Sequence, residues 1–477
     1  MQITSLAFVL LSIASILIFY LIRSKYRVGY LAVLSSFFIA SYSYQILVYV
    51  VLYALVNYFL GLKMQAAQTK TAFFRLGIVL NLLQLLLLRY SSFAIDPVLS
   101  IFSESLSISR LSEIIVPIGI SYFTLQGIGY LINIKMGWEK PEGKFLPFLL
   151  YIVFFPKFLS GPVERSNHFL PQLKKDQQFN PQQVEEGLRI ALFGFFKKIA
   201  IANQIAPYVI NAYSDIDSIS GNLLWIMLLI GPLYIYFDFS GYTDIAIGIA
   251  RALGIELLPN FNRPFFSENV TTFWKRFHIS LSSWFNDYVF RQTSFKYRKW
   301  GIYASIFALL VTWSLFGIWH GAGWNFMVLG FVQALAIIYE FTTKKWRVKA
   351  FSGVPERLRV WFGRICTYLF YAGSLVFFYS ANLGVAFKYF TKLADIGGPL
   401  MLGPVSRAPY SVFIYIPVLL ILELLRNDYQ QTYGKLEAYW YHSTPKRQML
   451  RWTLYSLMIV LVLIVGQKGE QFIYVNF

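Results

Sequence analysis

Four histidines are the side chains best suited to acid–base chemistry in this sequence: His168, His278, His320 and His442. His320 lies in an apolar stretch, where glycines and tryptophans surround it. A neutral imidazole in a dry pocket can take a proton from an attacking hydroxyl, and neighbouring glycines let a substrate or a helix approach the ring closely. We therefore predict that His320 acts as a general base. The alternative is a buried structural histidine that hydrogen-bonds to a neighbouring helix.

His278 is the second candidate, and it lies in a segment where basic and aromatic residues alternate. It is too far from His320 in the chain to share a helix with it, so only folding can bring the two rings together. An assisting role beside His320 and a position among lipid headgroups both remain open. His168 and His442 occur in polar loops, and we assign no role to them.

Two carboxylates, Asp238 and Asp244, fall inside another apolar stretch. Carboxylates in such a place must pair, bind something or be protonated. They lack the histidine partners that a zinc site needs, so we expect no metal. A hydrogen-bond or ion-pair role between helices is the main interpretation, with Tyr234, Tyr242 and Arg251 as candidate partners.

The composition indicates a membrane protein, with 57% hydrophobic and only 14% charged residues. Soluble chains carry about 25% charged residues. The net charge of +19 comes mostly from basic residues in short loops between apolar stretches. That arrangement is typical of topology signals and does not suggest nucleic-acid binding. Cys366 is the single cysteine, which excludes a disulfide within the chain and a multi-cysteine metal site.

The apolar stretches predict an all-α, multi-pass protein with about 11–13 transmembrane or re-entrant helices. Some stretches are too short to cross a bilayer alone. The predicted stretches are 5–22, 28–43, 45–62, 74–90, 113–133, 145–160, 187–210, 222–252, 300–319, 323–342, 361–385, 410–425 and 450–466.

The basic loops predict the orientation, because positive charge collects on the cytoplasmic side. The densest cluster is 344–349, and the weakly charged segment 91–112 is expected outside. Both termini then face outward. Segment 259–300 is too polar to span, and we expect an amphipathic helix in the cytoplasmic interface, with Ser267 or Asn269 as its N-cap.

Several blocks of sequence resemble a known family. The segments 274–281 (W-x-x-x-H-I-S-L) and 319–324 (W-H-G-x-x-W) resemble the two signature blocks of the membrane-bound O-acyltransferase (MBOAT) superfamily. The segments 161–165 (GPVER) with 171–173, and 237–244 (FDFSGYTD), look like its bacterial alginate O-acetylase (AlgI-type) branch. The likeness runs from about residue 110 to the C-terminus.

This resemblance implies one membrane domain over 1–477, in which helices surround a central tunnel. It comprises N-terminal helices (1–110), a core (111–466) and an extracytoplasmic tail (467–477). His320 matches the family's catalytic histidine, and His278 matches its second one. Further expected tunnel or donor-binding residues are Trp274, Trp319, Trp324, Asp238, Asp244 and Asp287.

The chain departs from the branch at two positions. Phe277 stands where tryptophan usually precedes the histidine, and this change keeps an aromatic ring. Asn286 stands where arginine usually precedes Asp287, and the lost charge puts donor or partner contacts near Asp287 in doubt.

The last six residues, 472–477, form an F-x-Y-x-x-F ending. It resembles the C-terminal motif of bacterial acyl exporters in this family and of the small partner peptide in the D-alanylation system. The hydroxyl of Tyr474 is a possible covalent acyl relay. The alternative is that these aromatic residues anchor the tail at the membrane interface.

These observations lead to an O-acyltransferase of the bacterial cytoplasmic (inner) membrane that uses acetyl-CoA as donor and holds no cofactor or metal. It would work with an extracytoplasmic polysaccharide-modifying partner on a polysaccharide acceptor. D-alanyl transfer from a carrier protein to teichoic acid is the alternative within the family. A transporter or flippase for lipid-linked sugars is the alternative of another class, although the paired repeats typical of transporters are not evident.

Overall fold

The structure is a computed structural model that describes residues 2–66, 68–99, 101, 119–396 and 444–465. Every regular element among these residues is helical, apart from one isolated bridge between Phe261 and Phe277. The chain forms two compact units. The first contains the residues up to Ala191 together with Tyr242–Leu258, and the second contains Leu192–Gly241 and the described chain from Pro259 onward. The all-α prediction is confirmed.

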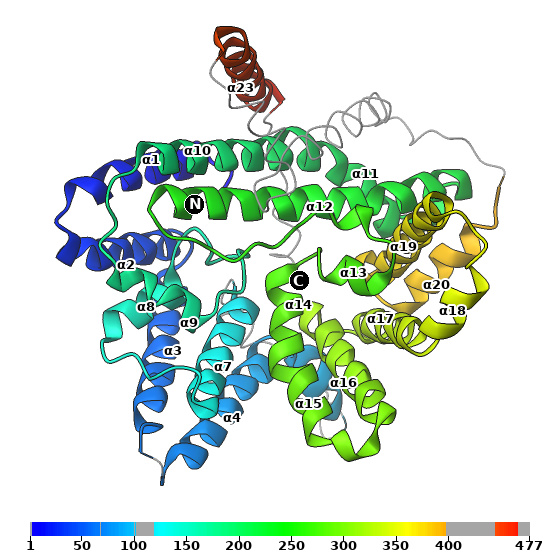
Figure 1. Ribbon diagram of the computed structural model, residues 1–477, viewed down its shortest axis with the longest axis horizontal. Helices are drawn as coiled ribbons and strands as arrows, with labels where there is room; N and C mark the ends of the chain where they lie inside the picture. Colours follow the sequence, from blue (N-terminus) through cyan, green and yellow to red (C-terminus); the bar gives the residue numbers. More distant parts are fainter. Residues whose placement is uncertain (1, 67, 100, 102–118, 397–443, 466–477) are drawn as a thin grey trace. The chain divides into compact units, whose positions relative to one another are not determined.

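The first unit is built on helices that pack around α7. In Figure 1, α3, α4 and α7 lie side by side. A buried polar chain links α3 to α4, because the Tyr53 hydroxyl donates to Asn81 Oδ1 (2.6 Å) and Asn81 Nδ2 donates to Asn57 Oδ1 (2.8 Å). The helices of this unit are α1 (Leu6–Leu21), α2 (Ser24–Ala40), α3 (Tyr44–Lys63), α4 (Lys70–Leu88), η1 (Ser91–Ile95), α5 (Asp96–Leu99), α7 (Ile120–Met136), α8 (Phe145–Val153), α9 (Ser166–Phe169), η2 (Gln172–Lys174), the larger part of α10 (Pro181–Phe195) and the end of α12 (Gly221–Ala252).

The second unit carries both candidate histidines. Figure 1 shows α14 and α15 continuing one another beside α16, with α17 next to α16. The helices of this unit, besides the end of α10 and the larger part of α12, are η3 (Phe196–Ala202), α11 (Asn203–Ser214), η4 (Ile216–Ser218), η5 (Pro264–Phe266), α13 (Val270–Trp274), α14 (Ile279–Phe285), η6 (Asn286–Phe290), α15 (Arg291–Lys296), η7 (Arg298–Trp300), α16 (Ile302–His320), α17 (Trp324–Thr342), α18 (Lys344–Ala350), α19 (Glu356–Tyr379), α20 (Leu383–Lys392) and α23 (Pro445–Val465).

Six helices in the described part are long and apolar enough to cross a membrane. They are α3, α4, α12, α16, α17 and α19. The predicted stretch 145–160 is helical only as far as Val153, and 187–210 is divided among α10, a π-helical turn (η3) and α11. The stretch 410–425 lies outside the described residues, so the larger helix count stays a prediction.

Glycines allow α16 and α17 to cross at close range. A Cβ added at Gly317 would lie under 3.0 Å from the carbonyl oxygen of Phe326, and one added at Gly330 would lie equally close to the carbonyl oxygen of Trp313. These are backbone atoms that cannot turn aside. Small residues at such crossings let membrane helices pack directly against one another, and this one fixes the end of α16 at His320.

The segment 259–300 differs from the expected single amphipathic helix. It consists of short helices, and His278 interrupts them with a left-handed backbone (φ 49°, ψ 49°). Asn269 is the N-cap of α13 as predicted, because its side chain accepts from Thr272 N (2.7 Å), whereas Ser267 follows η5. Phe273 is among the many aromatic residues of this segment that are buried, so the segment is part of the core of its unit.

Candidate active site

His320 is the last residue of α16, and its ring has a defined hydrogen bond. Its Nδ1 lies 2.8 Å from the carbonyl oxygen of Phe316, one turn earlier. A carbonyl oxygen can only accept, so Nδ1 carries a proton, and in the neutral ring the lone pair lies on Nε2. His320 is 5% exposed, and the rings of Trp319 and Phe378 contact it at 4.9 and 5.9 Å between centroids. In its neutral form the ring can therefore accept a proton through Nε2.

Two backbone hydrogen bonds, made by residues on either side of His278, hold its backbone in place. Asn262 N donates to the carbonyl oxygen of Arg276, and Ile279 N donates to that of Asn260, both at 2.9 Å. The side chain of Asn260 adds to this, because its Oδ1 accepts from Ser280 N (3.2 Å) and Ser280 Oγ (2.5 Å). A left-handed residue other than glycine is uncommon and is held only where its surroundings enforce it. Such strain is typical of functional sites.

The ring of His278 is completely buried. Phe239 contacts it edge-on at 4.6 Å, and Trp319 lies 5.9 Å away between centroids. Neither ring nitrogen has a hydrogen-bond partner among the described residues. Burial holds the pKa of His278 well below its usual value, and the nearby His320 lowers it further. The fold therefore brings the two predicted histidines together, with Trp319 in contact with both.

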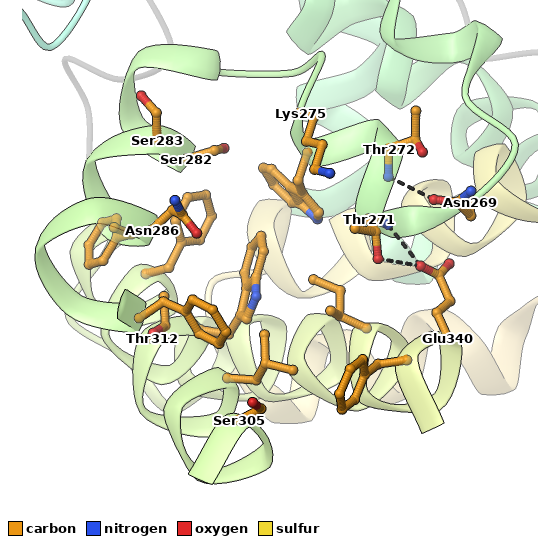
Figure 2. Close-up of a pocket in the computed structure, with 18 of the residues that line it drawn as sticks. Asn269, Thr271, Thr272, Lys275, Ser282, Ser283, Asn286, Ser305, Thr312 and Glu340 are labelled. Atoms are coloured by element: carbon orange, nitrogen blue, oxygen red, sulfur yellow. Dashed lines mark hydrogen bonds between the residues drawn. The ribbon is translucent and has the colours of Figure 1, made fainter. Parts of the chain in front are cut away.

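A cavity of about 920 Å³ lies in the same unit, and Phe316 is one of its lining residues. Figure 2 shows Ser282, Ser283 and Asn286 on one side of it, opposite Thr271 and Glu340. Its aromatic lining residues are Trp274, Phe285, Phe290, Trp313, Phe316 and Phe341, and its cationic ones are Lys275, Arg291, Lys344 and Arg347. Phe316, one of the lining residues, also contacts the His320 ring at 4.7 Å between centroids, so the cavity reaches the neighbourhood of His320.

Polar residues on one face of α17 position the cavity wall, and the sequence analysis missed them. Gln333 Oε1 accepts from Trp274 Nε1 (3.0 Å). One carboxylate oxygen of Glu340 accepts from Val270 N (2.6 Å) and the other accepts from Thr271 N (2.9 Å). Polar side chains seven residues apart in an apolar helix share a face, and that spacing was an available signal. The role of Asn260, in an irregular segment, had no comparable signal.

The other expected tunnel residues lie in different surroundings. Trp274 lines the cavity. Trp324 begins α17 and is 62% exposed. Asp287 accepts from Asn286 Nδ2 (3.1 Å) and lies 3.5 Å from Arg291 Nη1, both of which belong to cavity residues. Tyr474 lies outside the described residues.

Asp238 forms a buried ion pair with Lys198, from the π-helical turn η3. Both side chains are almost fully covered, which confirms the predicted ion-pair role for this carboxylate. Asp244 is buried too, in the first unit. Arg251 was wrongly proposed as a partner for these carboxylates, because it binds Glu186 (Nε–Oε2 2.9 Å) at the end of α12.

The family model described as MBOAT, the membrane-bound O-acyltransferase family, matches residues 140–382, which include both histidines and the cavity. The chain belongs to this family. As an MBOAT protein it is a multi-pass membrane O-acyltransferase, in agreement with its apolar helices.

Curated relatives extend this family assignment. The chain is 29% identical over 394 residues to the Azotobacter vinelandii protein named "Probable alginate O-acetylase AlgI", which covers 80% of this chain and 75% of that protein. It is 29% identical over 403 residues to the peptidoglycan O-acetyltransferase of Helicobacter pylori, covering 77% and 74%. It is 32% identical over 241 residues to the teichoic acid D-alanyltransferase of Bacillus subtilis, covering 49% and 60%.

Proposed function

We propose that this protein takes an acetyl group from cytoplasmic acetyl-CoA and passes it across the bacterial inner membrane for O-acetylation of an extracytoplasmic polysaccharide. The observation that carries the proposal is the Nδ1–H tautomer of His320, which leaves a basic Nε2 next to a buried neutral histidine. The names of the relatives support the acetyl group and the polysaccharide acceptor.

The chemistry follows from the two rings. Nε2 of His320 takes the proton of an attacking hydroxyl as the hydroxyl oxygen bonds to the thioester carbonyl carbon. The carbon–sulfur bond then breaks, and the leaving thiolate receives the proton from His320. His278 orients the donor through its ring nitrogens. A buried site strengthens these hydrogen bonds and keeps out water that would hydrolyse the thioester.

The cavity has the chemistry that a coenzyme A thioester needs. Lys275, Arg291, Lys344 and Arg347 supply positive charge for phosphate groups. The aromatic residues suit the apolar pantetheine arm and an adenine ring. Glu340 is the single acidic residue of the lining, and its oxygens are occupied by the backbone and hydroxyl of α13. A polyanionic donor therefore meets little electrostatic opposition here.

In this proposal the C-terminal tail and a partner protein receive the acetyl group after it leaves the donor. We propose that Tyr474 accepts the acetyl group as an ester, and that an extracytoplasmic partner moves it to the polymer. Tyr474→Phe removes only the hydroxyl and should abolish polymer acetylation. Wild-type acetylation in this variant would return the tail to an anchoring role.

D-alanyl transfer is the second candidate, because the match to the teichoic acid D-alanyltransferase is of comparable identity over about half of the chain. It requires an acylated carrier protein as donor. Purified protein that releases CoA from acetyl-CoA without any carrier protein would favour acetyl transfer. Activity with a D-alanyl carrier protein alone would favour the second candidate.

The central experiment is His320→Ala in the producing cell, with mass-spectrometric measurement of acetyl esters on the surface polysaccharide. We expect the esters to be lost while the membrane level of the protein stays normal. His168→Gln is the control, because His168 binds Glu164 in a partly exposed turn of the first unit and should leave acetylation unchanged. Retained acetylation in the His320→Ala strain would refute the proposed mechanism.

A further inference from the structure

A segment rich in basic and aromatic residues, 344–364, joins two of the long apolar helices. It contains α18 and the first turns of α19, and it follows α17, which ends at Thr342. Both α17 and α19 are long and apolar enough to cross a membrane, and they pack against each other. A chain that leaves the bilayer with one helix and re-enters it with the next must pass through the lipid headgroups. The connectivity therefore places segment 344–364 at the membrane surface.

The charge of this segment is strongly positive. It contains seven basic residues and one acidic residue, Glu356. Lys345 and Lys349 are exposed and lie one turn apart in α18, and Arg357 and Arg359 are exposed at the start of α19. None of these four side chains forms an ion pair with another described residue. Their charge is thus available to an anionic partner.

Exposed apolar side chains lie between these charges. Trp346, Trp361 and Phe362 are between 57% and 63% exposed. A single exposed apolar residue is common, but a group of them in so short a segment marks a surface that contacts a membrane or another protein. Basic residues that only determine the topology need no such neighbours. Tryptophan together with lysine and arginine is typical of segments that lie in the membrane interface.

We propose that segment 344–364 binds the phosphate groups of anionic phospholipids and anchors α17 and α19 in the headgroup layer. The basic side chains pair with the phosphates, and the exposed rings enter the layer beneath them. An acidic soluble protein would offer complementary charge as well, but the connectivity holds this segment against lipid whether or not such a protein is bound. The inference depends on neither the donor nor the acceptor proposed above.

The test is native mass spectrometry of the purified full-length protein in a neutral detergent, titrated with phosphatidylglycerol or with phosphatidylcholine of the same acyl chains. The wild type should bind phosphatidylglycerol at least about tenfold more tightly, because each lysine or arginine near an anionic headgroup strengthens binding about fivefold. Lys345→Gln, Lys349→Gln, Arg357→Gln and Arg359→Gln, introduced together, should remove most of that preference. None of these four residues lines the cavity, so the change leaves the candidate active site intact.

The matched control changes four exposed lysines of the first unit, Lys63, Lys140, Lys144 and Lys175, to glutamine. It removes the same charge and should keep the preference for phosphatidylglycerol. Both variants are compared as folded protein, identified by gel filtration and by their unfolding temperature. An equal loss of preference in the two variants, or a wild type that binds both lipids alike, would overturn the inference. So would an acidic acyl carrier protein that the wild type binds and the 345–359 variant does not, with the lipid preference unchanged.

Discussion

Replacing Gly317 with alanine is the most direct test of how the helix crossing positions the catalytic centre. Gly317 lies one turn before His320, where α16 meets α17. An added Cβ would lie only 2.2 Å from the carbonyl oxygen of Phe326 and 3.0 Å from the Cα of Gly330, whereas real Cβ contacts are essentially never shorter than 3.0 Å. Both are backbone atoms, so the two helices must separate by roughly 1 Å at this point.

The magnitude follows from two opposing effects. Overpacking of this kind costs about 1–3 kcal/mol. Alanine recovers up to about 1 kcal/mol through its higher helix propensity. We therefore expect a net destabilisation of about 1–2 kcal/mol. A displacement of about 1 Å at His320 should lower the acyl-transfer rate roughly 100-fold. Activity should thus fall much more than stability.

The assay pairs thermal unfolding in detergent with thioester turnover by the same preparation. Gly373→Ala is the matched control, because a Cβ at Gly373, in α19, would meet nothing within 4 Å. We expect Gly373→Ala to match the wild type or to unfold at a slightly higher temperature. If Gly317→Ala behaves like Gly373→Ala in both measurements, the helix crossing does not position His320.

Substitutions at three further positions, Asn260, Lys198 and His168, give separate tests. Asn260→Ala should lower kcat about tenfold or more at nearly constant KM, because it removes the side chain that helps to hold the segment around His278. Asn260→Asp keeps an acceptor oxygen and should restore most of the rate. A kcat unaffected by the alanine substitution would contradict a positioning role for Asn260. Lys198→Met leaves Asp238 buried without its ion-pair partner and should destabilise the protein by about 3–5 kcal/mol. Adding Asp238→Leu to this variant should recover most of the lost stability. Equal stability of the single and double variants would argue against a buried ion pair that stabilises the fold. The hydrogen bond that His168 Nδ1 donates to the Glu164 carboxylate raises the pKa of His168. This pair therefore stabilises the fold fully below about pH 6.5 and loses its effect as the pH rises through the raised pKa. The difference in unfolding temperature between the wild type and His168→Gln should therefore be larger at pH 5.5 than at pH 8.5, and a difference independent of pH would exclude this linkage.

Hydrophobic patterning was sufficient to locate the long helices. The predicted stretches 222–252 and 323–342 coincide with α12 (Gly221–Ala252) and α17 (Trp324–Thr342) to within a residue or two. A helix in lipid must satisfy its own backbone and expose apolar side chains, so the information that defines it is local. The same argument explains why composition alone indicated an all-α membrane protein.

Local patterning failed where the backbone departs from the regular helix. The stretch 187–210 contains the π-helical turn Phe196–Ala202, and the segment 259–300 is divided at His278. Neither feature has a periodic signal. The left-handed backbone of His278 depends on hydrogen bonds that its neighbours make with a separate segment: Ile279 N donates to Asn260 O, and Asn262 N donates to Arg276 O. Such pairing follows from how the chain folds back on itself and cannot be deduced from residue spacing.

The sequence by itself determined the chemical type of the site. It shows one imidazole, His320, in an apolar stretch beside glycines, and a second imidazole, His278, in a segment of basic and aromatic residues. Only the tertiary structure decided how the two rings are placed and protonated. It aligned Nδ1 of His320 with the Phe316 carbonyl, enclosed His278 away from water, and packed Phe316, which lines the cavity, against the His320 ring. Residue type is a local property, whereas proximity, tautomer and accessible space arise from the packing of segments that are distant in the chain.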